Sequence, residues 1–287
     1  MRPLAKFLEN QLTKDELEMV PKSYDVMGSE GKGVAIIEIP KKLEDKKHLI
    51  AEAVMDVNKN VKSVLNKVSG RKGTFRLDEL ELVAGDEDTE VLHKEYGYML
   101  KLDPQKVFFS PREATDRDRI ASLVKPGETV LVLFSGVAPY PIAIAKKSDA
   151  KVYGVDINPA AHEYAKENIR INKLAHRIVV INDDVRNAGR IFDFKFDRIV
   201  MPIAVGGEDY LDEAFSMVKD GGVIHFYSFG DEKDLFSKAE GFVKEAANRN
   251  NIKFVVEQKN KVLPFGIRSH KICLDIKAGV PKPGLRD

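Results

Sequence analysis

Hydrophobic and polar positions follow two different patterns along the chain, and the change falls shortly after residue 100. Over residues 1 to about 20, apolar residues recur at helical spacing and predict one amphipathic helix. The following patterns predict strands at residues 24–28 and 34–39 around a glycine-rich turn, a helix at 45–55, a strand starting at Ser63, and a strand pair at 90–93 and 98–102. This mixture predicts an α+β module of about a hundred residues.

From Val107 onward, short apolar runs that are typical of buried strands alternate with helical patterns. The predicted strands cover residues 129–133, 151–155, 177–181, 197–201, 222–229, 253–258 and 270–276, and the helical patterns cover 138–147, 159–172, 209–218 and 231–248. Short strands joined by helices specify a mainly parallel, doubly wound sheet, and the last two strands are close enough in the chain to pair antiparallel at its edge. We therefore predict two domains, an α+β domain over residues 1–104 and a Rossmann-like α/β domain over residues 105–287.

Composition excludes several classes of protein. With 43% hydrophobic residues, the 287-residue chain can build ordinary cores, and its longest apolar runs are too short to span a bilayer. The first residues lack the apolar core of a signal peptide. The single cysteine, Cys273, cannot form an internal disulfide or a thiolate metal cluster, as expected in a reducing cytoplasm. We therefore expect a cytoplasmic protein with no membrane segment and no metal centre.

One segment of the first predicted domain is rich in basic residues. The net charge is +1 from 46 basic and 45 acidic residues, so overall electrostatics neither demand nor exclude a polyanionic partner. Residues 57–76, however, contain no acidic residue. Their basic residues are Lys59, Lys62, Lys67, Arg71, Lys72 and Arg76. This composition leaves two interpretations open, a solvated surface and a site of phosphate contact.

The turn after the first strand of the second domain is the first candidate for binding chemistry. It reads Phe134-Ser135-Gly136-Val137, and small residues at the carboxyl end of a strand let a cofactor approach the backbone and the N-terminus of the following helix. The glycine spacing of a dinucleotide-binding turn is absent, which disfavours a bound pyrophosphate. The turn therefore fits a cofactor without phosphates.

Acidic residues follow the next two predicted strands. Asp156 comes twenty residues after Gly136, and a carboxylate at the end of that strand can accept hydrogen bonds from both hydroxyls of a ribose. The third strand is followed by Asp183 and Asp184, where an acid could accept from an adenine amino group. Each acid alone is better explained as a helix cap, but together, in this order, they favour such a cofactor.

With these features the chain resembles the class I S-adenosylmethionine-dependent methyltransferases, and more closely the archaeal and eukaryal tRNA (guanine-N1)-methyltransferase family, which modifies the guanosine at tRNA position 37. The resemblance runs from about Tyr24 to Ile276. Its motifs include Gly73-Thr74-Phe75-Arg76, His93-Lys94-Glu95, Val107-Phe108-Phe109-Ser110-Pro111-Arg112, Asp116-Arg117, Phe134-Ser135-Gly136-Val137, Asp156-Ile157-Asn158-Pro159, Asp184-Val185-Arg186 and the run Gly221–Tyr227. Few unrelated methyltransferases share this whole series.

The resemblance implies S-adenosyl-L-methionine as the cofactor and the anticodon stem-loop of tRNA as the partner of a monomer. The cofactor-binding residues that it implies are Phe134, Ser135, Gly136, Val137, Asp156, Ile157, Asp184, Val185 and Pro202, and the substrate-binding residues are Lys59, Lys62, Lys67, Arg71, Lys72, Phe108 and Arg112. The additional small N-terminal domain of many relatives is expected to be absent, so that binding rests on residues 57–76. The implied fold is a class I methyltransferase sheet preceded by an α+β RNA-binding domain.

Methylation of guanine at N1 needs a base that removes the N1 proton and a cation or donor that stabilises the charge developing at O6. The family's glutamate in the first role matches Asp116, one methylene shorter, and its arginine in the second role matches Arg76. Asp116 is equally well explained as a carboxylate at a helix start that pairs with Arg117 or Arg119. Surface charge is the alternative for Arg76, but the basic run around it favours the role at O6. A family tyrosine near the base matches Phe108, so its hydroxyl contact is lost.

One departure from the family lies after the fourth strand, where many members have Asn-Leu-Pro and this chain has Met201-Pro202-Ile203-Ala204. A polar group that helps to hold the target base is therefore missing. Two alternatives to N1 methylation stay open: a wyosine-pathway enzyme, which transfers an aminocarboxypropyl group or methylates a tricyclic guanosine precursor, and a tRNA-binding protein with impaired catalysis. The turns at 110–112 and 134–137 resemble the methyltransferase branch more closely, so we predict methylation.

Overall fold

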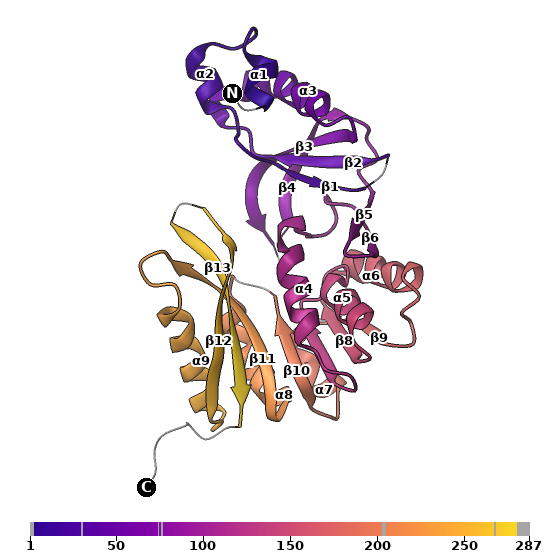
Figure 1. Ribbon diagram of the computed structural model, residues 1–287, viewed down its shortest axis with the longest axis vertical. Helices are drawn as coiled ribbons and strands as arrows, with labels where there is room; N and C mark the ends of the chain where they lie inside the picture. Colours follow the sequence, from indigo (N-terminus) through magenta and orange to yellow (C-terminus); the bar gives the residue numbers. More distant parts are fainter. Residues whose placement is uncertain are drawn as a thin grey trace. The chain divides into compact units, whose positions relative to one another are not determined.

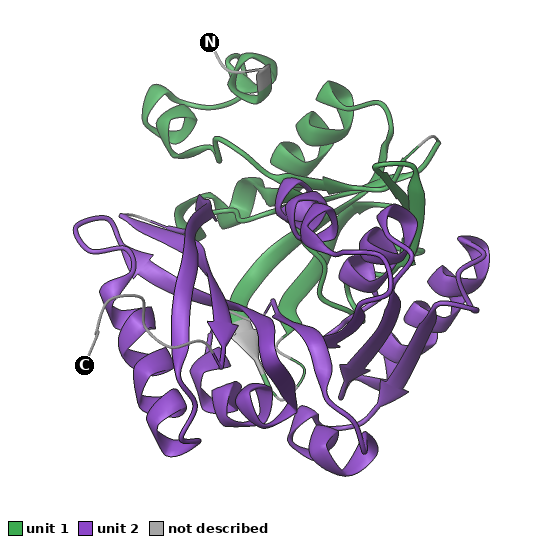
Figure 2. Ribbon diagram, turned by 60° about the horizontal axis from the view of Figure 1, so that its bottom comes forward, with its two compact units in different colours: residues 1–112 green, residues 113–287 purple. Residues whose placement is uncertain are grey.

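Two units make up the chain in the computed structural model, residues 1–112 and residues 113–287 (Figure 2). The structure describes residues 3–29, 31–73, 75, 77–202, 205–266 and 268–279, apart from the side chains of residues 3, 71 and 72. The predicted domain boundary lies between residues 104 and 105, whereas residues 105–112 belong to unit 1 in the structure. Among the described residues, no helix is both long and apolar enough to cross a membrane.

The described part of unit 1 forms a four-stranded sheet in the order β1-β2-β3-β4 and a two-stranded hairpin, β5-β6 (Figure 1). The strands are β1 (Asp25–Met27), β2 (Gly33–Ile37), β3 (Val61–Lys72), β4 (Leu77–Gly85), β5 (Val91–Glu95) and β6 (Tyr98–Leu102). The helices are α1 (Pro3–Leu8), α2 (Lys14–Met19) and α3 (Lys47–Val57), with 3₁₀ turns η1 (Lys41–Lys46) and η2 (Pro111–Glu113). Strands β2 and β3 are parallel and are joined through α3, whereas β1 and β4 pair antiparallel with their neighbours.

The N-terminal segment forms two helices rather than the single one that its apolar spacing predicts. The Thr13 hydroxyl accepts a hydrogen bond from the Glu16 N–H (3.3 Å), and the Glu16 carboxylate accepts one from the Thr13 N–H (2.7 Å). This reciprocal capping box starts a new helix at α2. Leu8 and Leu12 are buried as expected, whereas Phe7 is half exposed. The prediction of one helix is therefore wrong, because local capping interrupts the apolar period.

Unit 2 is built on a seven-stranded sheet, which in its described residues has the order β12-β13-β11-β10-β7-β8-β9 (Figure 1). Its strands are β7 (Thr129–Leu133), β8 (Lys151–Asp156), β9 (Ile178–Asn182), β10 (Phe196–Met201), β11 (Val218–Asp231), β12 (Phe254–Pro264) and β13 (Ser269–Ala278). Its helices are α4 (Ala114–Leu123), α5 (Pro139–Lys147), α6 (Pro159–Ile171), α7 (Ala188–Ile191), α8 (Leu211–Met217) and α9 (Ser237–Arg249), with 3₁₀ turns η3 (Val185–Asn187) and η4 (Gly207–Tyr210).

Strands β11, β10, β7, β8 and β9 are parallel, whereas β13 and β12 are antiparallel at one edge. The predicted doubly wound sheet with an antiparallel edge is therefore confirmed. Residues of α7, α8 and α9 pack into the apolar core on one face of the sheet. Helix α4, with α5 against it, lies on the other face. The strand order reverses between β7 and β10, and ligands of such sheets bind beside that point, at the carboxyl ends of the strands.

Candidate functional site

The turn after β7 has a strained backbone conformation. Phe134, Gly136 and Ala138 all have positive φ, at 55°, 54° and 67°. This conformation is unfavourable for residues other than glycine, and such strain is concentrated at ligand sites in proteins. Ala138 then forms the N-cap of α5. The strain therefore marks the same turn that the sequence selects as the cofactor turn.

Strand β8 and helix α6 hold this turn in place. A Cβ atom at Gly154 of β8 would lie 2.8 Å from Ser135 Oγ, closer than real Cβ atoms approach, so glycine makes room for the buried serine. The Ser135 N–H donates to the carbonyl of Val155 (3.0 Å), and the carbonyl of Val137 accepts from Asn168 Nδ2 (3.0 Å). The turn is thus fixed against β8 and α6.

Asp156 connects the first two turns at this edge. Its Oδ2 accepts from the Gly136 N–H (2.7 Å) and its Oδ1 from the Asn158 N–H (2.9 Å). Burial raises the pKa of Asp156, although these two hydrogen bonds act in the opposite direction. A carboxylate oxygen can accept two hydrogen bonds, so each still has capacity for a ribose hydroxyl. Ile157 beside it is exposed. The geometry therefore fits the predicted role of Asp156.

Asp184 acts as a helix cap, which is the simpler of the two explanations of this acid. Its Oδ1 accepts from the Arg186 N–H (2.9 Å), and its Oδ2 lies 2.5 Å from Arg186 Nη2. The hydrogen bond from the Arg186 side chain, opposed by burial, lowers the pKa of Asp184. Val185 is buried in the core of unit 2. Contact between Asp184 and an adenine stays a prediction.

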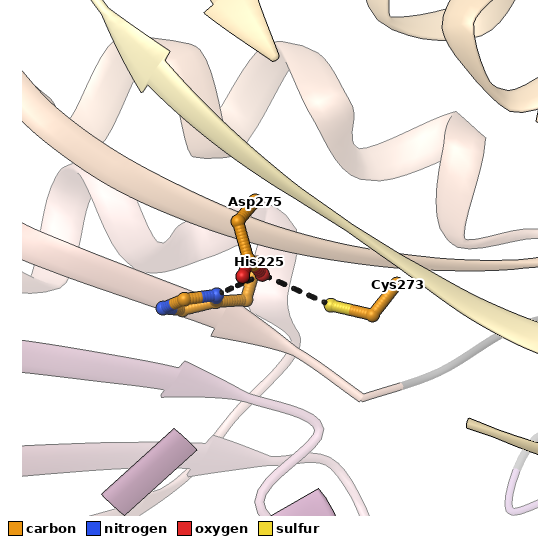
Figure 3. Close-up of side chains that lie close together, drawn as sticks. All are labelled: His225, Cys273 and Asp275. Carbon is orange, nitrogen blue, oxygen red and sulfur yellow. Dashed lines mark hydrogen bonds and ion pairs between the residues drawn. The ribbon is translucent and has the colours of Figure 1, made fainter. Parts of the chain in front are cut away.

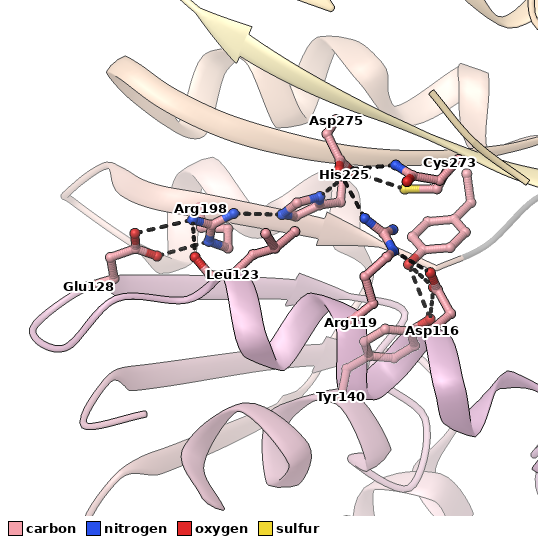
Figure 4. A network of polar contacts seen from close by, with 11 residues as sticks. Asp116, Arg119, Leu123, Glu128, Tyr140, Arg198, His225, Cys273 and Asp275 are labelled. Atoms are coloured by element: carbon pink, nitrogen blue, oxygen red, sulfur yellow. Dashed lines mark hydrogen bonds and ion pairs between the residues drawn. The ribbon is translucent and has the colours of Figure 1, made fainter. Parts of the chain in front are cut away.

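Asp116 lies buried in the first turn of α4, where three side chains hold its carboxylate (Figure 4). Its Oδ1 accepts from Arg119 Nε (2.8 Å), and its Oδ2 accepts from the hydroxyls of Tyr140 (3.1 Å) and Tyr227. Burial raises the pKa of both tyrosines well above the usual range, so both hydroxyls stay protonated and donate. The structure thus shows the pairing with Arg119 that was one explanation of Asp116, and its role as a base stays a prediction.

Polar residues alternate with apolar ones along β11 and β13. His225 and Tyr227 lie opposite Asp275 and Cys273 in the strand register. Successive side chains of a strand point to opposite faces, so these four share one face, the one that α4 covers. The residues between them belong to the apolar core under α8 and α9. This period of two is the signal that the sequence analysis missed.

The protonation of His225 follows from its neighbours. Its Nε2 lies 2.7 Å from Arg198 Nη1, and a guanidinium only donates, so Nε2 is an acceptor. Nδ1 therefore carries the proton and donates to Asp275 Oδ1 (2.6 Å). Burial lowers the pKa of His225, in agreement with a neutral ring. Burial alone would raise the pKa of Asp275, but the hydrogen bond from His225 and the charge of Arg119 hold it at about 2.

His225, Cys273 and Asp275 lie close enough together to hold a metal ion, but their chemistry does not fit one (Figure 3). Both ring nitrogens of His225 are engaged, and burial raises the pKa of the Cys273 thiol far above its usual range, so the sulfur is not the thiolate that metals bind. Two guanidinium groups also contact this cluster. We interpret it as part of one polar network (Figure 4), whose members in order are Glu128, Arg198, His225, Asp275, Arg119 and Asp116.

Pro202, the last of the predicted cofactor residues, follows β10 directly and is half buried. Its carbonyl accepts a hydrogen bond from Lys271 Nζ (2.9 Å). Ile203 and Ala204 lie outside the described residues. At the neighbouring turn, the ring of Phe134 contacts that of Tyr210 edge to face, with 4.9 Å between centroids.

The basic segment of unit 1 is partly neutralised by a strand that the sequence analysis did not predict. Strand β4 contains several acids, which are infrequent in strands, and it pairs with β3. Lys67 Nζ lies 3.1 Å from Asp78 of β4. Lys59 pairs with Asp56 (2.9 Å), and Lys62 donates to the Lys59 carbonyl (3.3 Å), although both lysines are exposed. The segment is therefore not a uniformly basic surface.

The other predicted substrate residues have mixed outcomes. Phe108 is exposed, and Arg112 Nε lies 2.5 Å from Asp25 Oδ1 at the start of β1. Contact of either with RNA stays a prediction. Three predicted residues lie beyond what the structure describes, Arg71 and Lys72 by their side chains and Arg76 altogether. The predicted pairing of Asp116 and Arg76 at one base is therefore outside the described geometry.

The cofactor turns and the strand order match a known family. Residues 91–255 match the TRM5/TYW2 methyltransferase domain, and residues 4–89 match the TYW2 N-terminal domain. The chain belongs to the TRM5/TYW2 methyltransferase family. This confirms the family and the fold that the sequence motifs predict.

Two relatives with different substrates are similar to the chain. The tRNA (guanine(37)-N(1))-methyltransferase Trm5b of Pyrococcus abyssi is 38% identical over 258 residues, which are 90% of this chain and 75% of the relative. The tRNA 4-demethylwyosine(37)-methyltransferase Taw21 of Saccharolobus solfataricus is 31% identical over 282 residues, 97% of this chain and 100% of the relative.

Solved structures show the same fold. The crystal structure of Trm5b from Pyrococcus abyssi matches with a TM-score of 0.85 over 98% of this chain and 82% of that chain, at 38% identity. The complex of aTrm5 with tRNALeu matches with a TM-score of 0.82 at 35% identity, over 94% and 76%. TYW2 of P. horikoshii in complex with MeSAdo matches with a TM-score of 0.78 at 27% identity, over 97% and 99%.

Proposed function

We propose that this protein transfers a methyl group from S-adenosyl-L-methionine to N1 of the guanosine at position 37 of tRNA. One observation carries the proposal: the strained turn at residues 134–138, joined to Asp156 at the switch point of the sheet. The similarity to Trm5b, which is named for this reaction, supports it. The complex of the related aTrm5 with tRNALeu supports tRNA as the partner.

The residues at this edge fit the proposed cofactor. Asp156 would accept hydrogen bonds from the ribose hydroxyls of the cofactor, and the turn around Gly136 would bring the protein backbone close to the rest of the cofactor. When bound, the cofactor supplies an electrophilic methyl group. The protein's task is then to hold the target base in line and to remove its N1 proton.

We propose Asp116 as the group that takes the N1 proton. Its Oδ2 accepts from two tyrosine hydroxyls, so Oδ1, which it shares with Arg119 Nε, has room for the N1 hydrogen bond. The guanidinium of Arg119 also fixes the orientation of the carboxylate. Arg76 keeps its proposed role at O6, on the strength of the family motif alone.

Substitution of Asp116 tests this role. Asp116→Asn should lower the single-turnover rate by roughly two to four orders of magnitude while cofactor affinity changes little, and Asp116→Glu should keep substantial activity. Asp118→Asn is the matched control, because Asp118 lies on the same helix and pairs with the exposed Lys147 (2.6 Å). A wild-type rate in Asp116→Asn would leave Asp116 as an anchor for Arg119 and place the base elsewhere.

A wyosine-pathway activity is the second candidate, because Pro202 replaces the family's asparagine and because Taw21 of Saccharolobus solfataricus is a relative. Cofactor labelled either in the methyl group or in the carboxyl carbon separates the possibilities. Methylation of any target brings only the methyl label into tRNA, and aminocarboxypropyl transfer brings only the carboxyl label. Binding of tRNA and cofactor without transfer of either label would indicate a binding protein instead.

A further inference from the structure

A buried ion pair lies at one edge of the unit 2 sheet. Lys271 Nζ is 2.8 Å from Glu113 Oε1, and the two side chains are 7% and 11% exposed. The same ammonium donates to the carbonyl of Pro202 (2.9 Å) and lies 4.9 Å from the ring centroid of Tyr227. Groups from three separate parts of the chain therefore surround one positive charge.

The strand register places this charge at the cofactor edge. Phe226 of β11 pairs with Met201, the last residue of β10. Lys271 of β13 pairs with Phe229, three residues further along β11. Lys271 therefore stands beyond the end of β10, beside Pro202. The turns after β7 and β8, which carry the proposed cofactor residues, end at the same edge.

Net stability does not account for burying the Lys271–Glu113 pair beside Pro202, so we looked for a role of this pair at the proposed methyl-transfer site. A buried ion pair contributes little net stability, because removing two charges from water offsets their attraction. Proline has no N–H and no polar side chain, so the carbonyl is the one polar group of Pro202. Lys271 holds that carbonyl, and Glu113 supplies the negative charge that lets an ammonium be buried there.

We propose that Lys271 is a positioning residue for methyl transfer. Its ammonium fixes the carbonyl of Pro202 and thereby the backbone that leaves β10 beside the switch point. Glu113 balances the charge of Lys271 and has no direct contact with the reacting groups. The inference rests on the proposed function, because it assigns Pro202 to the methyl-transfer site.

Paired substitutions test whether the donor to Pro202 matters for the rate. The double variant Glu113→Gln with Lys271→Met removes both charges together and removes the donor to Pro202. Glu113→Gln alone leaves the ammonium buried without its counter-charge, whereas Lys271→Arg keeps both the donor and the charge. A double variant of the exposed pair Glu257→Gln with Lys277→Met, which also involves β13, is the matched control.

The measurements are the single-turnover rate with tRNA, equilibrium binding of S-adenosylhomocysteine and of tRNA, and the midpoint of thermal unfolding. The double variant at Glu113 and Lys271 should be slower by roughly ten- to hundredfold, the range expected for one hydrogen bond to a charged group. Both binding constants should change less than about threefold, as expected if ground-state binding is unaffected. Lys271→Arg and the control should stay within about threefold of the wild-type rate, whereas Glu113→Gln should also be slower because it leaves the ammonium buried without its counter-charge.

Each other outcome overturns the proposal. A wild-type rate in the double variant would show that the Pro202 contact does not matter. Slowing of Lys271→Arg as great as that of the double variant would show that the donor to Pro202 does not set the rate. If the wild-type protein transfers no label to tRNA, the proposed function fails, and the inference fails with it. Measuring the wild type first distinguishes these cases.

Discussion

Arg119 is the cation between two buried acids, and its removal tests whether the polar network stabilises unit 2. Its Nε lies 2.8 Å from Asp116 Oδ1 and its Nη1 lies 2.9 Å from Asp275 Oδ2. The side chains of the two acids are 8% and 5% exposed, and that of Arg119 is 24% exposed. Arg119→Met keeps much of the apolar volume of the side chain but leaves both carboxylates without their cation.

The expected loss of stability follows from this burial. Breaking a buried ion pair costs about 3–5 kcal/mol, because the remaining charge stays buried and unpaired. Asp116 keeps its tyrosine partners and Asp275 keeps His225, so we expect one such loss rather than two. For a unit the size of residues 113–287, each kcal/mol lowers the Tm by about 2–4 °C, which gives a fall of roughly 6–20 °C.

Thermal unfolding followed by circular dichroism or calorimetry measures this loss. Lys147→Met is the control, because Lys147 and Asp118 form an exposed pair whose removal should cost about 1 kcal/mol or less. If Arg119→Met unfolds within 1 kcal/mol of the wild type, or no earlier than Lys147→Met, the network does not carry the stability that its burial suggests.

Two further predictions concern acid stability and RNA binding. The pKa of Asp275 is about 2 against an ordinary value of 3.8. The stability that ionised Asp275 contributes to the folded protein is therefore present above pH 4 and is lost as the pH falls towards 2. Wild-type protein should lose about 2 kcal/mol of unfolding free energy there that Asp275→Asn does not lose, and parallel acid-unfolding curves would contradict this. In unit 1, Lys62→Ala should weaken tRNA binding and reduce the slope of log affinity against log salt by about one. Lys67→Ala, whose ammonium pairs with Asp78, should change this slope less, and filter binding with equal slopes for wild type and Lys62→Ala would refute the assignment.

Short-range patterns were sufficient to predict the sheet of unit 2 and to place a turn and an acid at its switch point. Each strand there is an apolar run bounded by helical segments, and the turn at Gly136 and the acid Asp156 follow directly from strand ends. The rules for connecting such elements then specify a parallel sheet with an antiparallel edge. Strand β4 was missed because its apolar residues alternate with acids, which stabilise it only once the basic β3 lies beside them.

The polar networks could not be predicted in the same way, because they join residues that are far apart in the chain. His225 and Asp275 are 50 residues apart, and Glu113 and Lys271 are 158 apart. The strand register brings the first pair together, and the second pair meets where η2 lies against β13. The available signal was the alternation of polar residues within otherwise apolar strands, which indicates a polar face under a covering helix.

The central claim is methylation at N1 of guanosine 37, and nucleoside mass spectrometry of tRNA tests it most directly. Unmodified tRNA transcripts with guanosine or adenosine at position 37, and tRNA that already contains 4-demethylwyosine there, would be incubated with the protein and S-adenosyl-L-methionine. The tRNA would then be digested and its nucleosides separated by liquid chromatography. The expected product is 1-methylguanosine from the first transcript, with none from the second. An aminocarboxypropyl adduct, or methylation only of tRNA that already contains 4-demethylwyosine, would contradict it.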